Sequence, residues 1–215
     1  MKILNCSQPM LKQAVLAAML AVISNGSFAS FIAESEPNNS LATAQNIDGA
    51  FSSDFVTAIT DFAGTNISTS TDHVSIRATG DGSYDYYSFS VSGPMRGWFD
   101  IDDNNFDTEI AIWDSAFNIL GANDDATETG HTGGSFPSFL TYDFAAAGTY
   151  FVGVAAFPST AENGGWTGSA APQGGSYILH ASLEGSSVPV PATLALFGLG
   201  LVGISSIRRK QHKAG

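Results

Sequence analysis

The feature that most constrains the fold is an alternation of apolar and polar residues with a period of two, which recurs along the middle of the chain. Five runs show it: Tyr87, Phe89 and Val91; Ile110 and Ile112; Leu140, Tyr142 and Phe144; Tyr150, Val152 and Val154; and Tyr177, Leu179, Ala181 and Leu183. Successive side chains of a strand point to opposite faces of a sheet, so each run puts its apolar residues on one face. Helical periodicity is nearly absent from residues 47–184. The pattern predicts an all-β, antiparallel sandwich or barrel over 47–184.

Two short segments flank this body. Residues 30–46 have the composition of an extended segment, and 185–187 form a small Gly-Ser linker. Within the body, Gly164-Gly165 and Gly174-Gly175 indicate turns, so we expect a polar loop from Pro158 to Gly175.

The N-terminus has the layout of a secretory signal peptide. Lys2 and Lys12 precede an apolar stretch from Ala14 to Ile23, and Ser27-Phe28-Ala29 offers small residues at the positions a signal peptidase reads. We expect a signal helix in residues 1–29 and cleavage by signal peptidase after Ala29.

The C-terminus combines a proline pair, an apolar run and a basic cluster. Val188-Pro189-Val190-Pro191 precedes residues 192–207, and Arg208-Arg209-Lys210 follows them. As a helix, 192–207 is about 24 Å long, short of a hydrocarbon core of roughly 30 Å. It can still span the membrane, with the basic cluster on the cytoplasmic side. A permanent single-pass tail anchor is one interpretation.

The same residues in the same order resemble a PEP-CTERM sorting signal over 188–215. In such proteins an exosortase-type enzyme processes the tail. The resemblance implies an exported protein that is held transiently at the inner membrane by the 192–207 transmembrane helix and then reaches the cell surface or the extracellular space. One position departs from the pattern, because Val190 stands where the family has its glutamate.

Removal of both ends changes the charge of the protein. Only Arg77 and Arg96 remain among the basic residues, against 20 acidic residues, which gives a net charge of −18. Such a surface repels nucleic acid and anionic lipid. Cys6 is the only cysteine and lies in the signal peptide, so the exported chain has no disulfide or thiolate metal site. Crowded carboxylates favour bound divalent cations, although acidity also serves solubility alone.

Ordered motifs through the body resemble the bacterial pre-peptidase C-terminal domain. The opening 34–40, the strand Asp85 to Val91, the acidic segments 107–114 and 121–125, and the closing strands 147–154 and 175–179 match its pattern. The resemblance implies a jelly-roll-like sandwich without a catalytic role of its own, and no protease domain accompanies it here.

The first candidate metal site consists of Glu34, Glu36, Asn38, Asn39, Asp81 and Asp85. These are hard oxygen ligands, of which Ca²⁺ takes six to eight. Collagen-binding members of the resembled family hold calcium with this opening segment and with carboxylates just before the strand. The alternative is a solvated acidic linker.

The second candidate site consists of Asp100, Asp102, Asp107, Asp124 and Asp125, on two loops that can meet at one end of a sandwich. It is not an EF-hand, because Asn105 replaces the required glycine and Ala111 the bidentate glutamate. The alternative is that these residues cap their own backbone in Asx turns.

Other chemistry has weaker support. Trp98, Trp113, Trp166, Tyr84 and Tyr86 are candidates for a face that stacks on sugar rings, although a sandwich also buries such residues. A hydrolase would need His131 beside an acid and a nucleophile. We therefore expect a non-catalytic surface or matrix protein, with exopolysaccharide of biofilms as a candidate partner. A carbohydrate- or fibre-binding module is the alternative, and a hydrolase is a third.

Overall fold

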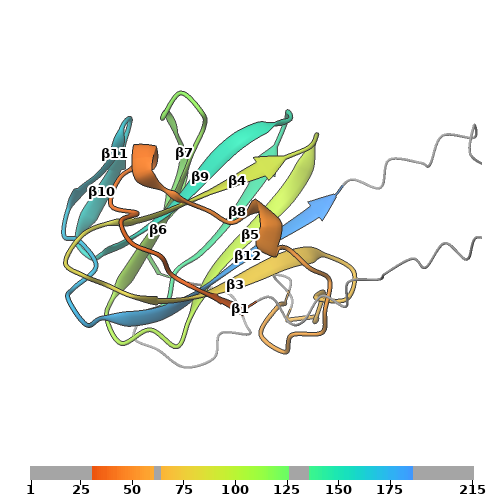
Figure 1. Cartoon of the computed structure of the whole chain (residues 1–215), viewed down its shortest axis with the longest axis horizontal. Helices are drawn as coiled ribbons and strands as arrows, with labels where there is room; N and C mark the ends of the chain where they lie inside the picture. The colour runs from red at the N-terminus through yellow and green to blue at the C-terminus, as the bar shows by residue number, and fades with distance from the viewer. Residues whose placement is uncertain (1–30, 61–63, 126–135, 186–215) are drawn as a thin grey trace, which may run out of the picture.

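Two five-stranded sheets pack face to face in the computed structural model, which describes residues 31–60, 64–125 and 136–185 (Figure 1). The first sheet has the order β1 (Phe31–Ala33), β3 (Asp72–Thr79), β12 (Ser176–Gly185), β5 (Met95–Asp102) and β8 (Phe139–Phe144). The second has the order β2 (Gln45–Asn46), β4 (Asp85–Val91), β9 (Gly148–Ala156), β6 (Thr108–Trp113) and β7 (Ile119–Asn123). The prediction of an all-β sandwich is confirmed.

The segment predicted to be extended contributes one short strand to each sheet. β1 pairs with β3, and β2 pairs with β4; both pairings are parallel, whereas all other strand pairs are antiparallel in the described residues. Two single 3-10 turns, η1 (Leu41–Thr43) and η2 (Asp48–Ala50), join and follow these strands. The opening segment is therefore tied to both layers of the sandwich.

The core lies between the two sheets and contains the faces that the alternation predicts. All five predicted runs contribute to it, with Leu140, Tyr142 and Tyr150 at its partly buried margin. Phe89 contacts Phe99 and Phe144 at ring-centroid distances of 5.4 and 5.7 Å. Each fully buried side chain of this size contributes about 1.5–3 kcal/mol of hydrophobic free energy. Burial of these alternating residues thus fixes the register of every main strand.

A second apolar cluster covers the outer face of the second sheet, and the sequence pattern did not predict it. The segment 158–175, expected to be a loop, contains the hairpin of β10 (Ser159–Glu162) and β11 (Gly165–Gly168), at the left end of Figure 1. Trp166 packs edge-on against Trp113 with centroids 5.6 Å apart. Gly153 permits this packing, because a Cβ there would lie 2.8 Å from Trp166 Nε1.

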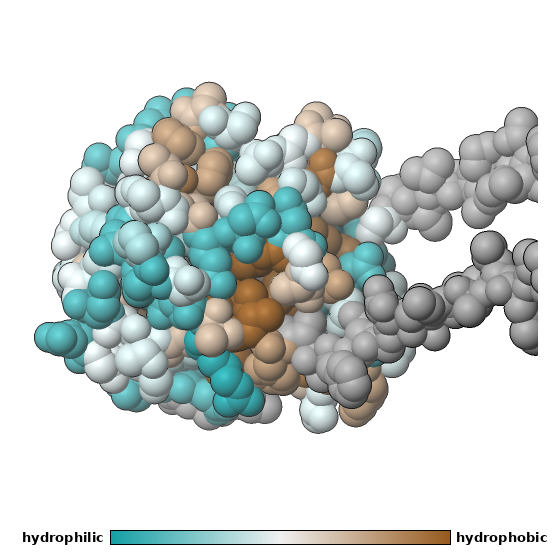
Figure 2. Space-filling view, in the orientation of Figure 1, coloured by the Kyte–Doolittle hydropathy of each residue, from teal (hydrophilic) through white to brown (hydrophobic). Residues whose placement is uncertain are grey.

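The hydropathy of the surface is seen on one face of the molecule. The face shown in Figure 2 is largely hydrophilic or neutral, with hydrophobic residues gathered in one strip near its middle. No helix among residues 31–60, 64–125 and 136–185 is long and apolar enough to cross a membrane. The predicted signal helix of 1–29 and transmembrane helix of 192–207 lie outside these ranges.

Candidate metal centre

Three carboxylates of the first predicted site meet where β1 ends and β4 begins. Glu34, Glu36 and Asp85 each place an oxygen within 4.8 Å of the others. Glu34 follows β1, and its backbone N–H donates to Arg77 O of β3 at 3.0 Å. Asp85 opens β4, which belongs to the other sheet. The centre therefore bridges the two layers of the sandwich.

Asn38 holds the opening segment in place around these acids. Its side-chain Nδ2 donates to Glu34 Oε1 at 3.0 Å, and its backbone N–H donates to Glu36 Oε2 at 2.8 Å. Tyr86 N–H donates to Asn38 O at 3.1 Å, which joins the segment to β4 beside Asp85. Asn38 is fully buried, yet its Oδ1 has no partner among the described residues.

Asp85 is fully buried, and its Oδ1 also lacks a hydrogen-bond partner in the described part of the chain. Burial raises the pKa of Asp85 to about 8; repulsion from Glu34 adds to this, and the Tyr177 hydroxyl opposes it. Burial also raises the pKa of Glu36, with Asp81 and Glu34 contributing by repulsion. Two buried oxygens that lack hydrogen-bond donors thus lie among acids that no positively charged side chain of the described residues neutralises. This arrangement fits a bound metal ion.

Two tyrosine hydroxyls connect the acids in a chain of oxygens. Tyr177 Oη lies 2.7 Å from Asp85 Oδ2 and 2.8 Å from Tyr87 Oη, which in turn lies 2.7 Å from Glu34 Oε1. Three contacts need three protons, and the two hydroxyls supply only two. Tyr177 donates to Asp85 and Tyr87 donates to Glu34, so both hydroxyl protons are directed at carboxylates. A metal ion bound at Asp85 would compete with a proton on this carboxyl, whose pKa is raised by burial.

The remaining members of the first predicted site lie nearer the solvent. Asp81 is exposed in the turn before β4, where its Oδ1 accepts from Ser83 N–H at 2.9 Å, and its charge raises the pKa of both Glu36 and Asp85. Asn39 is exposed. The sequence reasoning missed Tyr87 and Tyr177, which it counted only as apolar core residues.

The structure divides the second predicted site. Asp107, Asp124 and Asp125 place oxygens within 4.8 Å of one another. Asp100 and Asp102 belong to β5, so the expectation that they lie on a shared loop is wrong. Asp102 is buried on the outer face of the first sheet, with its Oδ2 at 3.4 Å from His180 Nε2 of β12. A strand pairing with β12, distant in sequence, determines this position.

The residue types of a hydrolase triad occur together in Ser75, His180 and Asp102. A substrate has no access to them. Ser75 Oγ lies 2.7 Å from His180 Nδ1, and all three residues are buried. The space beside His180 is about 10 Å³ and is covered by residues 58–60. This is too small for a substrate, so the group acts in this fold as a buried hydrogen-bonded cluster. His131, the histidine considered from the sequence, lies outside the described residues.

The aromatic face predicted for sugar stacking is not formed. Trp98, Trp113, Trp166 and Tyr86 are 9% exposed or less. Trp113 Nε1 donates to Glu162 O at 2.7 Å, and the Tyr86 hydroxyl accepts from Trp166 N–H at 2.8 Å. Trp166 of the hairpin β10–β11 packs with Trp113 and Tyr86, and Trp98 lies in the other sheet beside residues 58–60, so the expectation of an exposed platform is wrong for these four residues.

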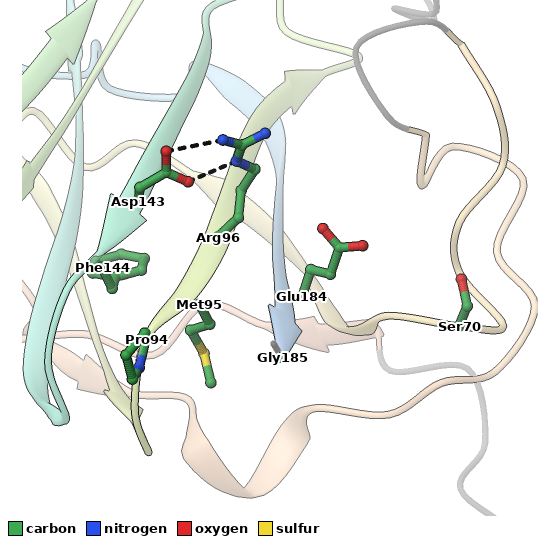
Figure 3. Close-up of a pocket in the computed structure, with 8 residues that line it drawn as sticks. All are labelled: Ser70, Pro94, Met95, Arg96, Asp143, Phe144, Glu184 and Gly185. Carbon is green, nitrogen blue, oxygen red and sulfur yellow. Dashed lines mark hydrogen bonds and ion pairs between the residues drawn. The ribbon is translucent and has the colours of Figure 1, made fainter. Parts of the chain in front are cut away.

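A hollow of about 590 Å³ surrounds an ion pair at the end of the first sheet (Figure 3). Arg96 donates from Nε and Nη2 to the two carboxylate oxygens of Asp143 at 2.7 and 2.9 Å. These contacts hold the pKa of Asp143 below its ordinary value. Figure 3 places Glu184 on the neighbouring strand, beyond this pair. A paired, exposed guanidinium beside Met95 and Phe144 does not make a nucleophile or a general base.

Comparisons with known proteins agree with the sequence analysis of the C-terminus. Residues 187–210 match the PEP-CTERM protein-sorting motif. The predicted signal residues Val188, Pro189, Pro191, Arg208, Arg209 and Lys210 all fall in this range. No curated protein matches the chain.

Among solved structures, one that is similar is the pre-peptidase C-terminal domain of a collagenase from Bacillus anthracis. The identity is 12% and the TM-score 0.33, over 52% of this chain and 88% of that one. The chain combines a β-sandwich body with a PEP-CTERM sorting motif that follows it in the sequence.

Proposed function

We propose that this chain is an exported, non-catalytic protein of the cell surface or extracellular matrix, whose body is stabilised by calcium at Glu34, Glu36 and Asp85. The sorting motif at 187–210 implies export and processing by an exosortase-type enzyme. Signal peptidase removes 1–29, the 192–207 helix holds the chain at the inner membrane, and exosortase then cuts near Pro191. Exopolysaccharide of a biofilm is the proposed environment, because sorting signals of this type accompany its production.

The observation that carries the calcium proposal is the pair of buried oxygens, Asn38 Oδ1 and Asp85 Oδ1, that have no partner among the described residues. They lie with three carboxylates, and neither arginine of the described residues pairs with them, because Arg96 binds Asp143 and Arg77 lies over the Phe31 ring. Calcium accepts amide and carboxylate oxygens together, at dissociation constants of about 10⁻⁴–10⁻³ M in extracellular modules. A cation would also join the two sheets at this end.

The non-catalytic role is supported by the local geometry. The serine, histidine and aspartate in contact are buried, and the hollow of about 590 Å³ surrounds an exposed ion pair. Burial of the tryptophans also removes the main support for a carbohydrate-binding module.

Deletion of 188–215 tests the sorting role. The truncated protein is expected in the culture medium, and the full chain with the cell envelope. A shorter deletion, 211–215, is the matched control, because it leaves the whole sorting motif intact. If the 188–215 deletion stays bound to cells, the tail is not the retention device.

A further inference from the structure

A second group of acids lies at one end of β6 and β7, which are the last two strands in the order of the second sheet. Asp107 precedes β6, and Glu109 lies within it; Asn123 ends β7, and Asp124 and Asp125 follow. Asn123 pairs with Ile110 in the ladder, which brings the residues after β7 beside Glu109 and Asp107. The carboxylates of Asp107, Asp124 and Asp125 meet within 4.8 Å.

Glu109 provides an independent indication of a ligand. It is only 7% exposed, and its Oε2 has no hydrogen-bond partner in the described residues. Glu109, Asn123 and Asp124 line the same hollow of about 290 Å³. Asn123 Oδ1, Asp124 Oδ1 and Asp107 Oδ1 are likewise buried atoms without partners within the described ranges. Four acceptor oxygens without a donor thus gather at one edge of the sheet.

The electrostatics agree with this geometry. Burial raises the pKa of Glu109; a backbone hydrogen bond from Ser159 opposes the effect, and Asp124 and Asp107 add to it. Burial also raises the pKa of Asp107 and of Asp124, and repulsion from Asp125 contributes to both. Neither arginine of the body compensates these charges, because one is paired with Asp143 and the other lies over Phe31.

We propose that Asp107, Glu109, Asn123, Asp124 and Asp125 form a second site for a divalent cation of the calcium class. Four carboxylates and one amide oxygen are the hard ligands that Ca²⁺ takes in sets of six to eight, with water completing the shell. The hollow beside Glu109 admits that water. Mg²⁺ fits less well, because it demands near-ideal octahedral geometry. The bound ion would tie the segment before β6 to the end of β7.

Trp166 supplies a spectroscopic signal for this site. Its indole lines the same hollow as Glu109 and Asp124, whereas the first centre is lined by the hydroxyls of Tyr87 and Tyr177. Terbium replaces calcium in oxygen sites and luminesces when an adjacent indole transfers energy to it. Excitation at the red edge of the tryptophan band, where tyrosine does not absorb, should therefore report mainly on the second site.

The experiment uses the exported protein, with calcium titrated by calorimetry and terbium by luminescence. Wild type is expected to bind two ions, and the double variant Glu109→Gln, Asp124→Asn to bind one and to lose most tryptophan-sensitised luminescence. Glu162→Gln is the matched control, because it removes one exposed carboxylate from the adjacent hairpin. Circular dichroism checks that each variant is folded.

The second site does not depend on the first, and Asp85→Asn separates them. Loss of one ion in the double variant and of the other in Asp85→Asn supports both sites. A double variant that is folded and binds as many ions as wild type, with unchanged luminescence, overturns the second site and leaves the first intact. An Asp85→Asn protein that binds as wild type does overturns only the first.

Discussion

Replacement of Asp85 by asparagine should stabilise the metal-free protein at pH 8 and remove most of the stabilisation that calcium gives to wild type. In the metal-free protein the pKa of Asp85 is about 8, against 3.8 ordinarily. Between these pH values the fold keeps a proton that the unfolded chain has released, so the free energy of unfolding falls as pH rises. At about 1.36 kcal/mol per pH unit, the ionised carboxylate costs the metal-free fold at most about 6 kcal/mol above pH 8.

Asparagine cannot ionise, yet it keeps an oxygen for the Tyr177 hydroxyl. In chelator at pH 8 the variant is therefore expected to be more stable than wild type. Near pH 5 wild-type Asp85 is protonated, and the advantage should largely disappear. In excess calcium this advantage should narrow, because wild type gains about 2.7 kcal/mol at a hundredfold excess over its dissociation constant, and the variant has lost a ligand.

Thermal unfolding at pH 5 and pH 8, each in chelator and in a hundredfold excess of calcium over its dissociation constant, measures all four conditions. Glu162→Gln is the control for loss of one carboxylate, and it should follow wild type throughout. If Asp85→Asn is less stable than wild type by the same amount in all four conditions, the buried carboxylate serves only in packing, and the reasoning fails.

Three further substitutions test other parts of the structure. Gly153→Ala should lower the free energy of unfolding by about 1–3 kcal/mol in urea titrations, because its Cβ would lie within 2.9 Å of the Trp166, Trp113 and Tyr86 rings; an unchanged midpoint would contradict the packing of the hairpin. Ser75→Ala should cost about 1–3 kcal/mol by the same measurement, since it leaves His180 Nδ1 buried without its partner; a neutral result would refute that role. Arg96→Ala should leave the melting temperature nearly unchanged, because side-chain exposures of 52% and 70% screen the ion pair; a large loss would show that the pair is structural.

The sequence predicted the strands whose two faces differ in polarity. Phe89 and Leu179 lie on inner faces as their alternation indicated. The hairpin β10–β11 was missed because its strands have four residues each and β11 both begins and ends with glycine, so turn composition outweighs the strand pattern. Its stability comes from Trp166 packing on Trp113, a contact between distant segments that no local pattern reveals.

The candidate sites were predictable only in part, for the same reason. Glu34 and Glu36 precede a proline on an extended segment, and Asp85 opens a recognisable strand. The local sequence was therefore enough to predict the acids of the first centre. Asp102 was assigned to a loop because neighbouring aspartates imitate turn chemistry, although its position depends on pairing with β12. Glu109 carries no turn signal at all, because it lies on the outer face of β6 among apolar residues.

The intact mass of the surface-exposed protein tests the central claim most directly, because it reports both processing steps at once. The account predicts a chain that begins at Ser30 and ends near Pro191, recovered from the cell surface or the medium. Recovery of the unprocessed chain, still carrying residues 1–29 and 192–215, from the cytosol would contradict it.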